Sequence, residues 1–214
     1  MKLKIENYKE QNKIWPAKGK HIMAQYDEEK IIVYQSYRPE IGLFAAKNQY
    51  FGGPFKLTRM TWIKPNFLWM MYRNGWGQKE GQEITLAIHL KIEAFKKYVN
   101  EVVFSTFKPE MYENYDLWQK RVKSSNARLQ WDPDHDPHGN KLERRAIQIG
   151  LRNKLIASYA KDDILEIEDI TPFVHEQYKF VKEKNLDALS VPFEKPFLFK
   201  ENRLNKKLEL DNEA

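Results

Sequence analysis

The stretch RMTWIKPNFLWMMYRNGWG (Arg59–Gly77) combines three tryptophans and three methionines with three cationic residues. Pro65 suits the first position of a helix, and Gly75 suits the residue just past its end. We therefore expect a short helix over Pro65–Asn74. Its interior, Phe67–Tyr72, is apolar on every side, and a helix of that kind is buried on every side. The stretch predicts a buried helix that forms part of the core, with charged residues at both of its ends.

Length and composition favour one globular domain. The chain has 214 residues, of which 42% are hydrophobic and 14% aromatic, enough to build one sizeable core. We expect an N-terminal extension over residues 1–19, a single domain over 20–199, and a charged, frayed tail over 200–214. The chain contains no cysteine, which excludes disulfides, thiolate catalysis and cysteine-ligated metal sites.

The charge balance favours an anionic partner. The formal net charge is +6 and the isoelectric point is near 9.2, which suits a nucleotide or a nucleic acid. The 36 basic and 30 acidic residues are interspersed, so a solvated surface of mixed charge is the alternative. The first residues lack the apolar segment of a signal peptide, and no window resembles a membrane span. We expect a soluble cytoplasmic protein without a membrane partner, of an oligomeric state that the sequence leaves open.

The order of expected elements indicates an α+β fold, a compact domain of antiparallel sheets and packed helices. Alternation and turn residues predict strands over His21–Tyr26, Ile31–Tyr37, Glu83–Leu90, Arg128–Trp131, Ala146–Leu151 and Ile164–Ile170. The first two are expected to form a β-hairpin. Helical signals predict further helices over Pro39–Asn48, Ile92–Val103, Tyr115–Lys123, Asn153–Ala160 and Thr171–Lys184.

The Arg59–Gly77 stretch resembles a bacterial and fungal family known as domain of unknown function 4291. Further segments support the resemblance: VYQSYRPEIG (Val33–Gly42), GQEITLAI (Gly81–Ile88), LQWDP (Leu129–Pro133), RAIQIGL (Arg145–Leu151) and IEDITPFV (Ile167–Val174). It covers about Lys20 to Val181, nearly the whole expected domain. The family brings no established activity, so the function must be argued from the residues.

The order of elements also resembles the layout of ADP-ribosyltransferase-like domains, which bind NAD in a cleft between two small sheets. That layout implies NAD as a cofactor and assigns the catalytic positions to Gln35, Thr61 and Gln148. Gln35 stands where His or Arg is usual, and Gln148 stands where a catalytic Glu is expected. The likeness is therefore one of fold, from which function does not follow directly.

Cationic residues bracket the predicted buried helix. A guanidinium keeps its charge, so beside buried aromatic rings it needs an anionic partner. One interpretation is a phosphate clamp with a tryptophan face for a base, and the other is structural pairing with Glu40, Glu83 or a helix C-terminus. The expected ligand-binding residues are Arg38, Arg59, Trp62, Lys64, Arg73 and Trp76.

The loop Asp132–Glu143 has the acidic spacing of a calcium loop, but Pro137 occupies the position that requires glycine. We expect a surface hairpin and no metal site, although His135 and His138 leave a transition-metal pair open. His89 and His175 are either proton carriers or hydrogen-bonded structural residues.

Three functions remain open. The first is an enzyme, or a relative of one, with a cleft for NAD or another nucleotide. The second is an RNA- or DNA-binding module that uses the same cations and aromatic rings, and the third is a scaffold whose aromatic block is only core. Cations gathered in a concave pocket favour the first, and cations spread along a face favour the second.

Overall fold

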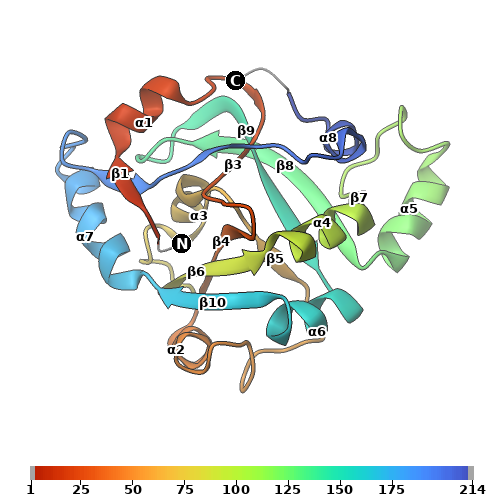
Figure 1. Cartoon of the computed structure of the whole chain (residues 1–214), viewed down its shortest axis with the longest axis horizontal. Helices are drawn as coiled ribbons and strands as arrows, with labels where there is room; N and C mark the ends of the chain where they lie inside the picture. Colours follow the sequence, from red (N-terminus) through yellow and green to blue (C-terminus); the bar gives the residue numbers. More distant parts are fainter. Residues whose placement is uncertain (1–2, 212–214) are drawn as a thin grey trace.

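A computed structural model of the protein describes residues 3–211, and its strands form two main sheets (Figure 1). The antiparallel three-stranded sheet contains, in spatial order, β10 (Ile164–Asp169), β6 (Ile84–Lys91) and β4 (Lys30–Tyr37). The larger, mixed sheet contains β2 (Gly19–Lys20), β9 (Lys141–Leu151), β8 (Ala127–His135) and β7 (Val102–Phe104), with β5 (Thr61–Ile63) also paired to β9. Two short sheets join β1 (Ile5–Asn7) to β11 (Ser190–Pro192) and β3 (Ile22–Ala24) to β12 (Lys195–Phe197).

Helices pack around these sheets, which confirms the predicted α+β class. They are α1 (Tyr8–Ile14), α2 (Pro39–Asn48), α3 (Phe67–Asn74), α4 (Ile92–Glu101), α5 (Tyr115–Ser124), α6 (Lys154–Lys161), α7 (Thr171–Lys182) and α8 (Asn202–Leu208). Helix α4 contacts strands of both main sheets, whereas α7 and α5 lie at opposite ends of the molecule (Figure 1). Among the described residues, no helix has the length and apolar content needed to cross a membrane.

The two main sheets meet where β4 passes β5. The backbone N–H of Tyr34 in β4 donates to the carbonyl oxygen of Lys64, just after β5, at 2.7 Å. On its other edge β5 pairs with β9, from Thr61↔Leu151 to Ile63↔Ile149. The C-terminal end of β4 is thereby held beside β5, at the boundary between the sheets.

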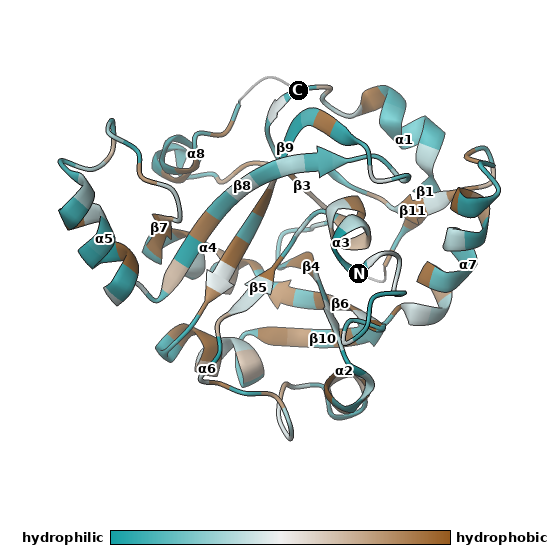
Figure 2. Cartoon of the chain, turned by 180° about the vertical axis from the view of Figure 1, so that it is seen from behind, coloured by the Kyte–Doolittle hydropathy of each residue, from teal (hydrophilic) through white to brown (hydrophobic). Residues whose placement is uncertain are grey.

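Two apolar clusters form the core. The larger one joins the sheets through Ile88 of β6, Ile149 of β9 and Phe95 of α4, all fully buried. The second surrounds α3 and includes Phe67 and Met71. Figure 2 shows the contrast between mainly hydrophobic β6 and β10 and mainly hydrophilic α5, a helix without buried residues. Because apolar burial is the main driving force of folding, the two clusters fix how the sheets meet.

Helix α3 starts two residues later than predicted. Asn66 is its N-cap, because the Asn66 side-chain oxygen accepts from the backbone N–H of Trp69 at 2.6 Å. Gly75 ends the helix with φ +58°, as predicted. The expectation of burial on every side was wrong at Tyr72, which is 47% exposed and stacks on the ring of His135.

The predicted first hairpin is present next to its turn, where Tyr26 pairs with Ile31 and the N–H of Ile32 donates to the carbonyl of Gln25. The N–H of Asp27 donates to the carbonyl of Lys30, but β3 forms its ladder with β12 and β4 forms its ladder with β6. Short strands with few residues carry a weak sequence signal, so the distant partner was missed.

Both ends of the chain are more ordered than the sequence suggested. The expected extension contains β1 and α1, and the expected frayed tail contains α8. Leu204 and Leu208 of α8 are buried, and the side chain of Asn205 exchanges hydrogen bonds with the backbone of Phe199. A single apolar stripe with i, i+4 spacing secures this helix, although most of its residues are charged or polar.

Candidate functional site

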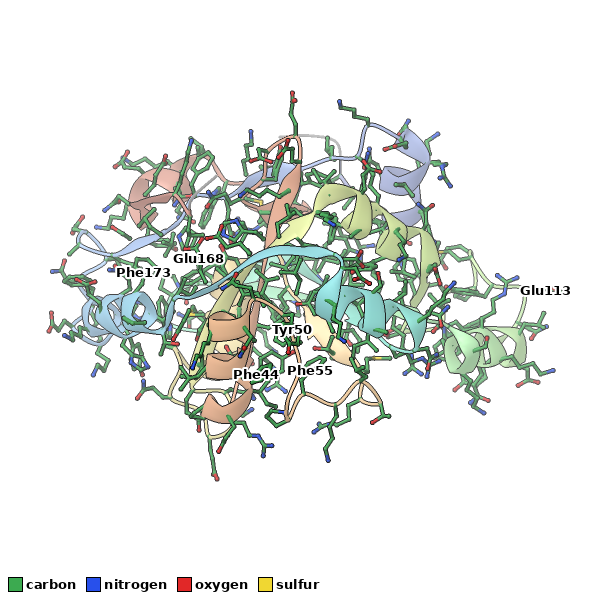
Figure 3. The ribbon with its side chains drawn as sticks, turned by 60° about the horizontal axis from the view of Figure 1, so that its bottom comes forward. Phe44, Tyr50, Phe55, Glu113, Glu168 and Phe173 are labelled. Atoms are coloured by element: carbon green, nitrogen blue, oxygen red, sulfur yellow. The ribbon has the colours of Figure 1, made fainter. Side chains whose placement is uncertain are left out.

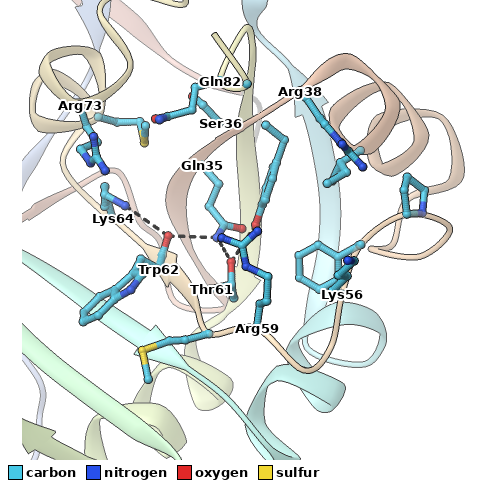
Figure 4. Close-up of a pocket in the computed structure, with 17 residues that line it drawn as sticks. Gln35, Ser36, Arg38, Lys56, Arg59, Thr61, Trp62, Lys64, Arg73 and Gln82 are labelled. Atoms are coloured by element: carbon cyan, nitrogen blue, oxygen red, sulfur yellow. Dashed lines mark hydrogen bonds between the residues drawn. The ribbon is translucent and has the colours of Figure 1, made fainter. Parts of the chain in front are cut away.

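A pocket of about 460 Å³ opens where β4 and β5 meet (Figure 4). Its volume is within the range of small-molecule sites, about 300–1,000 Å³. It is lined by Gln35, Ser36, Tyr37, Arg38, Ile41, Pro54, Phe55, Lys56, Arg59, Met60, Thr61, Trp62, Lys64, Met70, Arg73, Gly81 and Gln82. Among these lining residues are five cationic side chains and no carboxylate. The pocket is therefore electropositive by composition.

Four of the cations form an exposed rim: Arg38, Lys56, Arg59 and Arg73. Arg38 lies 3.5 Å from Glu40, but both side chains are more than half exposed, and such pairs are weak. Within the described part of the chain, the side chains of the other three make no ion pair. The predicted structural pairing with internal carboxylates is therefore limited to Arg38, and the rest of the rim is available to an external anion.

The floor of the pocket is a chain of buried hydrogen bonds. The hydroxyl of Tyr159 in α6 donates to Oε1 of Gln35 at 2.5 Å. Nε2 of Gln35 donates to Oγ1 of Thr61 at 2.7 Å and to the carbonyl of Trp62 at 3.0 Å. Oγ1 of Thr61 also lies 2.7 Å from the hydroxyl of Tyr37. Burial raises the pKa of both tyrosines, so their hydroxyls stay protonated at neutral pH.

Lys64 lies beside this floor and is only 6% exposed. Its Nζ is 3.4 Å from the carbonyl oxygen of Trp62 and 5.1 Å from the centre of the Trp69 ring. Burial and, second, the charge of Arg73 lower the pKa of Lys64 to about 7, against a weaker opposing effect of Asp132. Figure 4 shows Lys64 and Arg73 on the same side of the pocket. Lys64 is thus the lining cation whose charge changes near neutral pH.

Aromatic contacts hold the loop between α2 and β5 that forms another wall. The ring of Phe51 lies 4.8 Å from that of Phe55 and stacks on Tyr159 at 5.6 Å. Tyr50 and Phe44 pack edge to face at 5.6 Å, near Phe55 (Figure 3). Gly53 turns this loop with φ +56° against the Phe44 ring. The loop that carries Lys56 and Arg59 is therefore anchored to the residues of the floor.

The structure brings most of the predicted site residues together. Lining the pocket are the predicted catalytic residues Gln35 and Thr61, and the predicted ligand-binding residues Arg38, Arg59, Trp62, Lys64 and Arg73. Gln148 is not among the lining residues, since its Nε2 donates to Asp132 at 2.7 Å on the surface of β9. Trp76 lies in the second core cluster, where its Nε1 donates to the carbonyl of Pro137.

The sequence analysis missed two residues that form the floor of the pocket, Tyr37 and Tyr159. Tyr37 is two residues beyond Gln35 in β4, and the alternation of strand side chains places both on one face. This two-residue alternation could have identified Tyr37 from the sequence. Tyr159 comes from α6, and no local pattern links it to β4.

The acidic loop forms the predicted hairpin between β8 and β9. Its carboxylates do not converge: Asp132 accepts from Gln130 and Gln148, Asp134 pairs with Arg144 at 2.7 Å, and Asp136 accepts within the turn. The hairpin is as predicted, but it does not lie wholly at the surface, because Asp134 and His135 are buried.

A possible metal-ligand geometry occurs elsewhere among residues 3–211, at His89, Glu166 and Glu168. Nε2 of buried His89 hydrogen-bonds Oε1 of Glu168 at 2.5 Å. One ring nitrogen is thus already engaged, as in the hydrogen-bonded structural histidine that the sequence analysis considered.

Comparison with protein-family models gives a match over residues 21–197 to Domain of unknown function (DUF4291). The chain belongs to this family. The DUF4291 match begins before β3 and ends at β12, so it contains the whole pocket and leaves α1 and α8 outside. This confirms the family predicted from the Arg59–Gly77 stretch. A comparison with curated proteins finds no match.

Proposed function

We propose that the pocket binds a phosphate-bearing small molecule, a nucleotide of the NAD kind. The observation that carries the proposal is the set of five cations, without a carboxylate, that lines one concave site. Like charges repel when they are gathered, so this arrangement gains most from an anionic ligand. Arg38, Arg59 and Arg73 offer planar donors that suit phosphate oxygens.

The floor suits an uncharged polar group of the same ligand. The groups that line the pocket there are the hydroxyls of Tyr37 and Thr61 and the half-buried side chain of Trp62. Hydroxyls both donate and accept, so they fit a sugar or a carboxamide. A nucleotide with its phosphates at the rim and a polar head at the floor satisfies both parts of the pocket.

The lining residues do not supply the carboxylate that ADP-ribosyl transfer is expected to use. Gln35 is committed to Thr61 and Tyr159, and Gln148 is committed to Asp132. The proposal is therefore ligand binding by an ADP-ribosyltransferase-like cleft. A nucleic-acid module would spread its cations along a face, so the concentration of charge in one pocket favours the small ligand.

Calorimetry on the wild type and on Arg59→Gln tests this proposal, with NAD, ADP-ribose, ATP and an RNA oligonucleotide as titrants. We expect a nucleotide to bind the wild type and Arg59→Gln to lose about 1.5–3 kcal/mol of binding free energy, the value of a charged hydrogen bond. Because Arg59 is exposed and makes no ion pair in the described chain, stability should change by less than about 0.5 kcal/mol.

The matched control is Arg203→Gln, which removes an exposed arginine outside the pocket. It should bind like the wild type. Equal weakening in both variants would show that only net charge matters. Binding of RNA alone, without any nucleotide, would favour the nucleic-acid module.

A further inference from the structure

Lys64 differs from the other cations of the pocket in its surroundings. It is buried, whereas the rim cations are exposed, and no carboxylate forms an ion pair with it in the described chain. The groups that face it are the Trp69 ring and Arg73 from α3, the carbonyl of Trp62 from β5, and Asp132 from β8 at longer range. An ammonium group is poorly stabilised in such a place, because it is desolvated and lies beside another positive charge.

These surroundings favour the free amine, which has the lone pair needed for attack on carbon. Desolvation and a neighbouring cation are the two features that activate lysine for covalent chemistry with carbonyl compounds. The pKa of about 7 agrees with them, since roughly half of the molecules then carry the free amine at neutral pH. Exposed lysines have a pKa of about 10.4, so their fraction of free amine at neutral pH is about 10³-fold smaller.

We propose that the ε-amine of Lys64 condenses with the carbonyl carbon of a phosphate-bearing aldehyde or ketone, so that the pocket holds its ligand as an imine. The inference rests on the proposed function, because the rim must hold the phosphate. It narrows the ligand class to phosphate compounds with a free carbonyl, such as the open-chain form of a sugar phosphate or of ADP-ribose.

The chemistry balances without an oxidant or a reductant. The nitrogen of Lys64 attacks the carbonyl carbon and gives a carbinolamine. Loss of one water molecule then leaves the C=N bond, and water reverses both steps. The rim positions the phosphate while the amine meets the carbonyl, which turns a bimolecular reaction into one within the complex. The neutral hydroxyls of Tyr37 and Thr61 share one hydrogen bond, so one of the two keeps a proton for the carbinolamine oxygen.

Pyridoxal 5′-phosphate is a suitable probe, because it has both a phosphate and an aldehyde. The full-length protein is mixed with the probe at pH 7, reduced with borohydride, digested and mapped by mass spectrometry. We expect one label per chain, on Lys64, formed at least about tenfold faster than on any exposed lysine. Inorganic phosphate should slow it by competition.

The controls separate the amine from the phosphate site. Lys64→Met should abolish the fast label, whereas Lys47→Met, at an exposed lysine outside the pocket, should retain it. Pyridoxal without phosphate should label Lys64 at least about tenfold more slowly, since it lacks the charged contacts.

The outcomes distinguish this inference from the proposed function. Nucleotide or phosphate binding by calorimetry, with Lys64 unlabelled, would overturn the imine and leave the binding proposal standing. No calorimetric binding together with no selective label would overturn both. Equal labelling of Lys64 by pyridoxal and by its phosphate would show a reactive amine that phosphate does not direct, which also contradicts the proposal.

Discussion

Gln35 decides which hydrogen bonds the floor of the pocket can offer. Its Oε1 accepts from Tyr159, so its Nε2 must face Thr61 and the carbonyl of Trp62. Oγ1 of Thr61 therefore accepts from Gln35 and has one proton left to donate. That proton goes either to Tyr37 or to a ligand. The side-chain amide of Gln35, in β4 of the three-stranded sheet, thus sets the orientation of two hydroxyls in the pocket.

A double-mutant cycle tests this coupling. Gln35→Met and Tyr159→Phe should each cost about 1–3 kcal/mol of unfolding free energy, because each leaves a buried polar group without its partner. The double variant should cost less than the sum by at least about 0.5 kcal/mol, since it removes both partners of their shared hydrogen bond. Urea denaturation measures all four proteins. Strict additivity would show that the two side chains do not depend on each other.

The pH dependence of stability tests the environment of Lys64. Its folded pKa of about 7 lies below the ordinary value of 10.5. Between these values the unfolded chain binds a proton that the folded chain lacks, so the unfolding free energy rises with pH. In this pH range, Lys64 raises the unfolding free energy by at most about 1.4 kcal/mol per pH unit.

The comparison is between the wild type and Lys64→Met, measured by urea denaturation from about pH 7 to pH 10. Stability relative to the variant should increase with pH for the wild type. A constant difference over this window would show that the folded lysine keeps its proton, and this would also remove the chemical basis of the imine.

At the residue scale, the sequence identified pocket residues that lie within or next to a recognisable element. It misplaced residues whose position depends on backbone conformation or on strand register. Gln35 and Thr61 were assigned from the order of the expected elements, and Lys64 was assigned from its place beside the predicted helix; all three line the pocket. Trp76 was predicted to bind the ligand, but it does not line this pocket. It has φ +56° directly after Gly75, and its ring stacks on Tyr178. Gln148 pairs with Gln130 across the hairpin, a register that the sequence alone does not reveal.

At the scale of elements, α3 links the core to the pocket. Its inner face contributes Phe67 and Met71 to the second apolar cluster, while Met70 and Arg73 line the pocket. Trp69 is 5% exposed and presents its ring to Lys64. Loss of this helix would therefore remove core and site together.

Trp69→Ala should lower the unfolding free energy by about 3–5 kcal/mol, because it empties a large buried site. Tyr72→Ala is the matched control on the same helix, since Tyr72 is exposed and loses chiefly its stacking on His135, about 0.5–1.5 kcal/mol. Chemical denaturation gives both values. A cost below about 1 kcal/mol for Trp69→Ala would mean that the helix is not enclosed.

Elements with strong terminal signals were predicted well, and elements stabilised by distant contacts were not. Helix α2 has the predicted bounds, with Pro39 in its first turn and Gln49 in the left-handed conformation at its end. Strand β3 lies within the predicted strand His21–Tyr26, but its partner β12, nearly the whole chain away, was not predicted. Helix α8, which depends on the burial of Leu204 and Leu208, was not predicted either. Tertiary contacts of this kind leave little trace in a local window.

At the scale of the whole molecule, a buried polar network joins segments that are far apart in sequence. Arg144 of β9 pairs with Asp134 of β8 and donates to the carbonyl of Pro16, after α1. Glu194, just before β12, accepts from the backbone N–H of Phe67 at the start of α3, at 2.6 Å. The N-terminal segment, the long hairpin, α3 and the C-terminal strands therefore depend on one set of buried charges.

This network contains two carboxylates and one guanidinium, so one carboxylate lacks a counter-charge. Burial raises the pKa of Glu194 well above its ordinary value of 4.5, and the charge of Asp134 raises it further. The hydrogen bond from Phe67 and the charge of Arg144 oppose this effect. Glu194 is thus the member of the network that keeps its proton most readily.

The sign of the resulting pH dependence is opposite to that of Lys64. Below about pH 4.5 both the folded and the unfolded forms of Glu194 are protonated, and its contribution to stability is fully present. As the pH rises above that value, the unfolded carboxyl ionises while the folded one keeps its proton, so stability falls until the folded group ionises as well.

Glu194→Gln replaces the acid by a neutral group of the same shape, which removes this loss. The stability of the variant relative to the wild type should therefore increase from pH 5 to pH 8 in urea denaturation, by at most about 1.4 kcal/mol per pH unit. Glu113→Gln, at an exposed carboxylate before α5 (Figure 3), is the control for the loss of one negative charge and should show a much smaller change. A difference between Glu194→Gln and the wild type that does not vary with pH would show that Glu194 is ionised in the folded protein over this range, as it is in the unfolded chain.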